Sequence, residues 1–130
     1  MTSSWEREMM LAARRNFVTT SNRDLDVITS WWRQWMPYRF QPDQAIVSRG
    51  ECIARGYGAC GDAAADIAAT AVRAGLQAAI CIEAPAEWPG YAHARVLVGG
   101  RTYDPYADRR PAGLPPSCAL YLVASDMVHR

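Results

Sequence analysis

The sequence contains no lysine, and all fourteen of its basic residues are arginine. The chain therefore carries no side-chain amine that could accept an acyl group. Thirteen acidic residues nearly balance the arginines and leave a net charge of +1 at pH 7. A charge so close to zero gives no electrostatic reason to expect nucleic acid or an anionic membrane surface as a partner.

Histidine is scarce, and the cysteines lack the spacing of a metal site. The histidines are His93 and His129, and no C-x-x-C pair occurs among Cys52, Cys60, Cys81 and Cys118. Structural zinc sites take four ligands, often from such closely spaced pairs. The spacing does not favour zinc, and we expect the chain to require no metal or organic cofactor.

The chain also lacks a long hydrophobic run and an export signal. No apolar stretch approaches the roughly 20 residues of a membrane-spanning helix. Residues 1–8 have neither the basic start nor the apolar core of a signal peptide. We therefore expect a cytoplasmic protein that is not secreted by a signal peptide, makes no contact with a membrane and keeps its thiols reduced.

What the sequence does contain is the composition of one globular domain. Hydrophobic residues make up 50% and charged residues 21% of its 130 positions, enough for one core and too few for two domains. Periodicity and turn residues predict helices over 3–20, 24–36 and 60–74, a helical turn over 51–55, and strands over 78–82, 91–98, 101–106 and 118–124. This order predicts an α+β fold, in which N-terminal helices and a central helix pack on a small antiparallel sheet.

The two N-terminal helices have apolar sides of different character. The first, with Ser3 or Ser4 as its N-cap, has the apolar side Trp5, Met9, Leu11, Ala12 and Phe17. The second, which Pro37 ends, has the apolar side Leu25, Ile28, Trp31, Trp32 and Trp35. Three tryptophans in five positions favour core packing. Trp32 and Trp35 are also candidates for the wall of a substrate groove, together with Tyr57 and Arg95. A turn is expected at Gln41-Pro42-Asp43, and residues 125–130 stay unassigned.

The central helix follows a glycine-rich approach, Gly56-Tyr57-Gly58-Ala59-Cys60-Gly61-Asp62. Steps of three and four residues relate the apolar positions Ala63, Ala64, Ile67, Ala71 and Ala74, which predicts one buried helix face. Asp62, Asp66 and Arg73 fall on the opposite face, which we expect to meet solvent. Gly75 is placed to end the helix.

Cys60 stands on the first turn of this helix. The N–H groups there have no partner within the helix, and the helix dipole favours an anion such as a thiolate. The sequence position is equally compatible with a small buried hydrophobic residue that happens to begin a helix.

A predicted hairpin brings a histidine and an aspartate together. If Gly99-Gly100 forms its two-residue loop, Val98 pairs with Arg101. His93 and Asp104 then lie on the same sheet face as diagonal neighbours, within reach of a carboxylate–imidazole hydrogen bond. Each has an ordinary structural explanation, as a satisfied histidine on a hairpin and as an aspartate–proline turn.

Cysteine, histidine and acid together are the parts of a thiol nucleophile system. The histidine takes the thiol proton and later protonates the leaving group, while the acid orients the ring. The backbone N–H groups of Cys60 and Gly61 are candidates for the oxyanion donors.

Three sequence blocks resemble the transglutaminase-like superfamily of papain-type cysteine enzymes, particularly its compact bacterial and tailed-phage members. They are Gly58-Ala59-Cys60-Gly61-Asp62-Ala63-Ala64, the histidine-led strand His93-Ala94-Arg95-Val96-Leu97-Val98, and the aromatic-Asp-Pro motif Tyr103-Asp104-Pro105. The chain departs from the family at Arg95, where many relatives have tryptophan, and at Val47-Ser48, where phage-type relatives often have Gln-Ser.

The resemblance implies a papain-like core over residues 24–106, between an N-terminal helix in 1–23 and a C-terminal loop and strand in 107–130, all in one domain. It also implies a Cys60-His93-Asp104 triad that transfers an acyl group from an amide. Hydrolysis of a peptide or isopeptide bond in a protein or peptide substrate is expected rather than cross-linking.

Two other interpretations remain open. In the first, the chain keeps this fold as a structural subunit of a phage or bacterial assembly, incorporated in a virion and without activity. Alternatively, Cys60 is a redox-sensing thiol, for which Cys52 is the nearest candidate for a resolving cysteine.

Overall fold

The computed structural model describes residues 4–40 and 45–129 and has the α+β fold that the sequence predicts. In chain order, its elements are α1 (Ser4–Thr19), α2 (Leu25–Trp35), α3 (Arg49–Arg55), α4 (Cys60–Arg73), β1 (Ala79–Glu83), β2 (His93–Val98), β3 (Arg101–Tyr103), the 3₁₀ turn η1 (Ala107–Arg109), β4 (Leu120–Val123) and α5 (Ala124–His129). The predicted turn at 41–43 and the N-cap candidate Ser3 lie outside the described residues.

The four strands form one antiparallel sheet in the order β3-β2-β1-β4. β1 is buried along its whole length, which confirms the prediction of a central strand covered on both faces. The β2–β3 hairpin also has the predicted register, with Val98 opposite Arg101. Gly99 has a φ of 59° in its turn, a backbone conformation that suits glycine.

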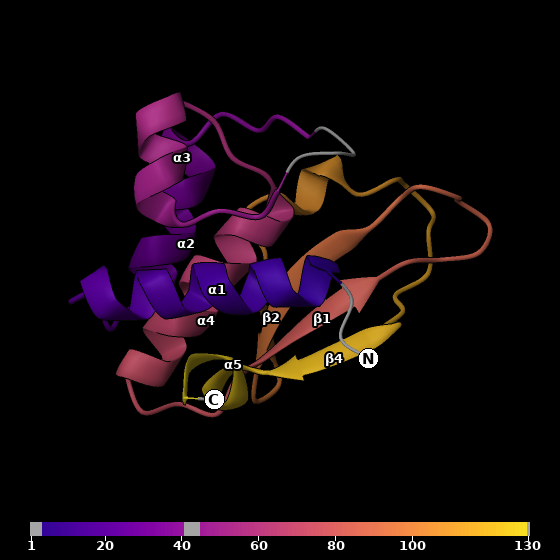
Figure 1. Ribbon diagram of the computed structural model, residues 1–130. Helices are drawn as coiled ribbons and strands as arrows, with labels where there is room; N and C mark the ends of the chain where they lie inside the picture. Colours follow the sequence, from indigo (N-terminus) through magenta and orange to yellow (C-terminus); the bar gives the residue numbers. More distant parts are fainter. Residues whose placement is uncertain (1–3, 41–44, 130) are drawn as a thin grey trace.

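Helix α4 lies between the other helices and the sheet (Figure 1). It packs against α1, α2 and α5 on one side and against β2 on the other. Its alanines are almost wholly buried, and their small side chains allow neighbouring elements to approach on every side. Helix α4 is therefore the scaffold on which both halves of the molecule are assembled.

The face of α4 expected to meet solvent is buried, so that prediction was wrong for its two aspartates. Asp62 is 2% exposed and Asp66 is 0% exposed. Val47 donates its N–H to Asp62, and the indole of Trp32 donates to Asp66 at 2.8 Å. The segment before α3 and helix α2 cover this face, and each brings a donor that compensates a buried carboxylate.

The apolar stripe of α2 is only partly core. Leu25, Ile28 and Trp32 are buried, while Trp35 is 71% exposed. Trp31 is half-buried and meets Trp32 edge to face. In α1, Leu11 is likewise 42% exposed and does not belong to the core. Both helices bury a narrower stripe than the spacing of apolar residues predicted.

The ends of several elements also differ from expectation. β2, β3 and β4 are shorter than the predicted strands, because loops take over at residues 91–92, 104–106 and 118–119. The last segment, for which the sequence indicated no structure, forms α5 and packs on α1 and α4. Gly75 follows α4 with a φ of 75°, as expected of the residue after a helix end.

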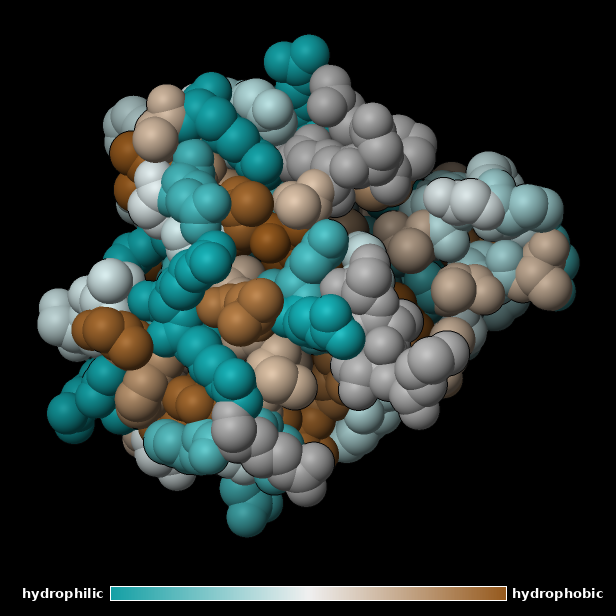
Figure 2. Space-filling model, viewed as in Figure 1, coloured by the Kyte–Doolittle hydropathy of each residue, from teal (hydrophilic) through white to brown (hydrophobic). Residues whose placement is uncertain are grey.

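The surface seen from the side of α1 mixes hydrophilic and hydrophobic side chains, and the loop between β1 and β2 projects beyond the helices (Figures 1 and 2). Within the described part of the chain, no helix is long and apolar enough to cross a membrane.

Candidate active site

The approach to α4 is held by backbone pairing against residues 37–39, the segment that follows α2. Gly58 donates its N–H to the carbonyl of Pro37 at 3.0 Å and accepts the N–H of Arg39 at 2.9 Å. A methyl group at Gly58 would lie 2.8 Å from Cζ3 of Trp32. Glycine is therefore required for the close approach that sets the start of α4, two residues before the thiol.

Asp62 anchors this helix start from within. Its carboxylate accepts the N–H of Ala59 at 2.9 Å, the N–H of Val47 at 2.8 Å and the guanidinium of Arg55 at 2.9 Å. The N-cap residue Ala59 has no side-chain oxygen, and no side chain caps the first turn. The N–H groups of Cys60 and Gly61 are thus left without an N-cap acceptor, the arrangement an oxyanion site needs.

The predicted contact between the histidine and the acid is present. Nε2 of His93 lies 2.6 Å from Oδ2 of Asp104, and the histidine side chain is only 2% exposed. The other carboxylate oxygen accepts the N–H of Tyr106 at 3.1 Å, closing a short turn around Pro105. The hydroxyl of Tyr106 in turn donates to the carbonyl of Met36. Asp104 is therefore fixed between the hairpin and α2.

His93 joins the acid to the thiol. Burial lowers the pKa of its imidazole, but hydrogen bonds with Asp104 and Cys60 raise it by more, to about 9. Because Nε2 faces Asp104, Nδ1 is the ring nitrogen that remains for Cys60. At neutral pH the ring is therefore protonated and places a positive charge between the sulfur and the carboxylate.

Tyr91 was not among the predicted site residues. Its ring stacks on His93, with 6.4 Å between ring centroids and 7° between ring planes. Burial raises the pKa of its hydroxyl to about 12. That hydroxyl has no hydrogen-bond partner among the described residues, so the contribution of Tyr91 is its flat ring against the imidazole.

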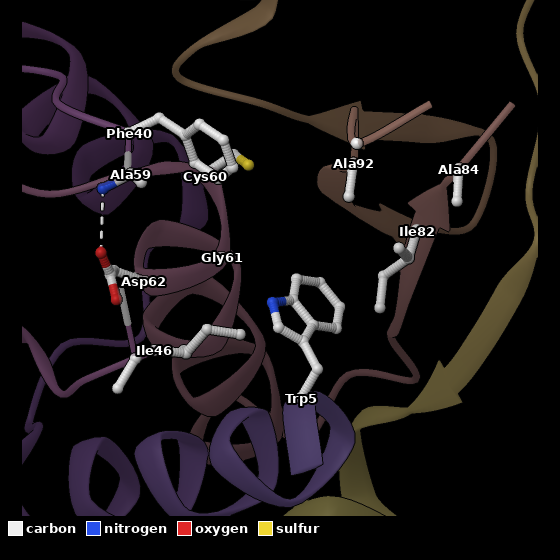
Figure 3. Close-up of a pocket in the computed structure, with 12 residues that line it drawn as sticks. Trp5, Phe40, Ile46, Ala59, Cys60, Gly61, Asp62, Ile82, Ala84 and Ala92 are labelled. Carbon is white, nitrogen blue, oxygen red and sulfur yellow. Dashed lines mark hydrogen bonds between the residues drawn. The ribbon is translucent and has the colours of Figure 1, made fainter. Parts of the chain in front are cut away.

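A cavity of about 430 Å³ opens at Cys60. Figure 3 shows the sulfur pointing into it beside Phe40, with Ile82, Ala84 and Ala92 across the space and Trp5 projecting from α1. Trp5 was predicted only on the apolar side of the first helix, and neither Phe40 nor Ile46 was predicted as a site residue. The residues that line the cavity come from segments far apart in sequence, so no local motif could have indicated the cavity.

The four further groove candidates do not line this cavity. Trp32 is wholly buried, and Trp35 lies on the exposed side of α2, so neither forms the groove wall expected of it. Tyr57 is half-buried, with the guanidiniums of Arg39 and Arg55 over its ring. Arg95 pairs with Glu83 at 3.0 Å.

Glu83 is the cross-strand partner of His93 but belongs to a separate charge cluster. Hydrogen bonds from Arg110 are the main reason that its pKa is lowered to about 2. Ser117 adds a backbone N–H at 3.0 Å. This buried carboxylate ties the loop after β3 to the sheet, because its hydrogen bonds run to Arg110 and Ser117.

All four cysteines are free thiols. Cys52 is buried beneath Gly58, and desolvation is the main cause that raises its pKa to about 12. Cys81 is buried in β1, and Cys118 is exposed. Among the residues the structure describes, no group of three or more histidine, cysteine and acidic side chains is placed to hold a metal ion.

Neither a protein-family model, nor a curated protein, nor a solved structure matches the chain. What this site does must therefore follow from its geometry.

Proposed function

We propose that the chain is a cysteine-dependent enzyme that transfers an acyl group from an amide through Cys60, His93 and Asp104. The observation that carries this proposal is the 2.6 Å contact between Nε2 of His93 and Oδ2 of Asp104, on an imidazole whose pKa is also raised by Cys60 at the uncapped start of α4. A buried histidine that only filled space would need neither partner. The three-block resemblance to transglutaminase-like enzymes supports the same roles.

The chemistry begins with a proton on His93 and a negative charge on Cys60. The thiolate attacks the amide carbonyl carbon, a C–S bond forms, and the N–H groups of Cys60 and Gly61 bind the developing oxyanion. His93 then gives its proton to the departing nitrogen as the C–N bond breaks, which leaves a thioester on Cys60. Asp104 holds the ring orientation and stabilises the imidazolium.

Water completes the cycle in the hydrolytic version. His93, now neutral, takes a proton from water as its oxygen attacks the thioester carbon. The C–S bond breaks, the acid product leaves, and the thiolate–imidazolium pair is restored. A peptide or isopeptide bond is the proposed target, with hydrolysis favoured over cross-linking by the family resemblance. Free thiols suit a reducing compartment, and we place the reaction in the cytoplasm.

Trapping of the thioester tests the proposal. The wild-type chain is mixed with a panel of peptide p-nitroanilides and peptide thioesters, quenched in acid, and analysed by intact mass and peptide mapping. We expect an added acyl mass on the peptide that contains Cys60, and none in Cys60→Ala.

Cys118→Ala is the matched control, because it removes the exposed thiol and should leave the added mass unchanged. An acyl mass on Cys118 alone, or none on any cysteine across the panel, contradicts the proposal. If the wild type and Cys60→Ala then assembled identically into a larger particle, the structural interpretation would take its place.

A further inference from the structure

The cavity beside Cys60 is apolar in a chain otherwise rich in arginine. Its walls include Trp5, Phe40, Ile46 and Ile82, and no arginine is among the described residues that line it. The one charged group among its lining residues, Asp62, already accepts hydrogen bonds from three donors. A charged group that entered would lose part of its hydration and find no oppositely charged, uncommitted side chain among the described lining residues.

The position of His93 tells which part of a substrate enters this space. His93 must protonate the leaving nitrogen, so the leaving group lies on the histidine side of the sulfur. His93 is not among the residues that line the cavity, whereas Cys60 and Gly61 are. The cavity is therefore on the acyl side of the thiol, next to the carbon that Cys60 attacks.

The size of the cavity limits the occupant. A volume of about 430 Å³ falls within the range of small-molecule pockets and exceeds what a glycine or alanine side chain would fill. An empty apolar space beside the reacting carbon would forfeit the contacts that an aliphatic or aromatic group can make.

We infer that the enzyme selects acyl donors with a bulky, uncharged aliphatic or aromatic side chain next to the attacked carbonyl, and rejects acidic ones. This inference rests on the proposed acyl transfer at Cys60 and adds the substrate class. Trp5, Phe40 and Ile46 form the selective surface, and Gly61 keeps it open. A methyl group at Gly61 would lie 3.1 Å from two carbons of Ile46.

The test uses acetyl-aminoacyl chloromethyl ketones with Gly, Leu, Phe or Asp side chains, which alkylate a thiolate with loss of chloride. The second-order rate at Cys60 is measured by mass spectrometry and divided by the rate with iodoacetamide, which has no side chain to place. We expect Leu and Phe to exceed Gly by about 10- to 100-fold, and Asp to fall below Gly.

A pair of alanines on the β1–β2 loop supplies matched variants. Ala84 lines the cavity, while Ala86, two residues further on, does not, and both are exposed. Ala84→Phe should reduce the Leu/Gly and Phe/Gly ratios by about tenfold by filling the cavity. Ala86→Phe should leave both ratios unchanged.

The outcomes separate the two proposals. If Cys60 reacts with iodoacetamide but shows equal normalised rates across the series, or prefers Asp, the pocket inference is overturned while acyl transfer stands. Ratios that Ala84→Phe does not lower also overturn it. If Cys60 reacts with none of the reagents, acyl transfer fails, and the pocket falls with it because no acyl group reaches the thiol.

Discussion

Helices α3 and α4 begin eleven residues apart but in opposite ways. α3 starts at an exposed capping box, in which Ser48 accepts the N–H of Glu51 at 3.3 Å and Glu51 accepts the N–H of Ser48 at 3.4 Å. α4 keeps only the returning half, in which Asp62 accepts the N–H of Ala59. The side-chain oxygen that would cap the first turn is absent because the N-cap residue is alanine.

The capping box stabilises the start of α3, whereas the start of α4 keeps N–H groups without a side-chain cap, as the proposed reaction requires. A cap typically contributes about 1 kcal/mol, and α4 forgoes it at the turn that carries Cys60. Asp62 compensates by tying the helix start to Val47 and Arg55. The N–H groups of the first turn then have no permanent side-chain acceptor, and in the proposed reaction they would bind the thiolate or the oxyanion.

The largest expected effect comes from removing the chemical groups at the α4 start. Cys60→Ala and His93→Ala should each lower kcat/KM by about 10⁴-fold or more, and the double variant should be hardly worse than either. Asp104→Asn should be less damaging, because an amide still holds the ring but stabilises an imidazolium poorly. Steady-state kinetics measure the losses, and circular dichroism melts check the fold. Additive losses would contradict a single catalytic unit.

The charge on His93 should make the reaction rate at Cys60 depend on pH. With a pKa of about 9, the imidazolium is lost as pH rises through that value. The rate should then fall about tenfold per pH unit, because the leaving group loses its proton donor. Asp104→Asn lacks the carboxylate that raises the pKa of His93, so in this variant the fall in rate should begin at lower pH. A pH–rate profile that is identical in the two proteins would contradict this coupling.

The same titration affects the free energy of unfolding. The folded pKa of His93 lies above its unfolded value of about 6.5, so the stabilisation is complete below pH 6.5. It is lost as the pH rises through about 9.

Substitutions at one glycine before α4 and one within α3 test how closely each helix start is packed. Gly58→Ala should lower the free energy of unfolding by about 1–3 kcal/mol, because the new methyl group meets Trp32 at 2.8 Å. Gly50→Ala within α3 is the matched control, since its nearest neighbour would be 4.0 Å away. It should raise stability by about 0.5–1 kcal/mol. Chemical denaturation measures both, and equal effects of the two substitutions would refute the tight approach to α4.

The smallest effects come from exchanging the caps themselves. Ser48→Ala should lower the free energy of unfolding by about 1 kcal/mol without changing activity. Ala59→Ser should stabilise α4 by a similar amount, since Ala59 already has the extended backbone of an N-cap. Its hydroxyl would occupy an N–H of the first turn and lower kcat about tenfold. Denaturation and kinetics on both variants check this, and a stabilised Ala59→Ser enzyme with full activity would count against the N–H of Gly61 as an oxyanion donor.

Local rules were enough to predict the contact between His93 and Asp104 and the helix that carries the thiol. Two glycines set the hairpin register, and this register places Asp104, one residue beyond β3, near His93. The stop at Gly75 and the central position of β1 also follow from short-range signals.

The remaining features depend on contacts between distant segments. Helical periodicity placed Asp62 and Asp66 in solvent, because the periodicity of one helix contains no information on residues 45–48 and α2, which fold over that face. Trp35 looked like core for the same reason and has no neighbour to bury it fully. The walls of the cavity come from α1, the segment before α3 and the sheet, and α5 is too short for a periodic signal.

The most direct measurement of the central claim is the rate of iodoacetamide labelling of each cysteine in the native protein at pH 6. An ordinary thiol is almost wholly protonated there and reacts slowly. Accessibility alone would favour Cys118, which is exposed, over Cys60, which is 5% exposed. We predict that Cys60 is labelled first, and that His93→Ala removes this preference. Labelling of Cys118 ahead of Cys60 in the wild type, or a Cys60 rate unaffected by His93→Ala, would contradict it.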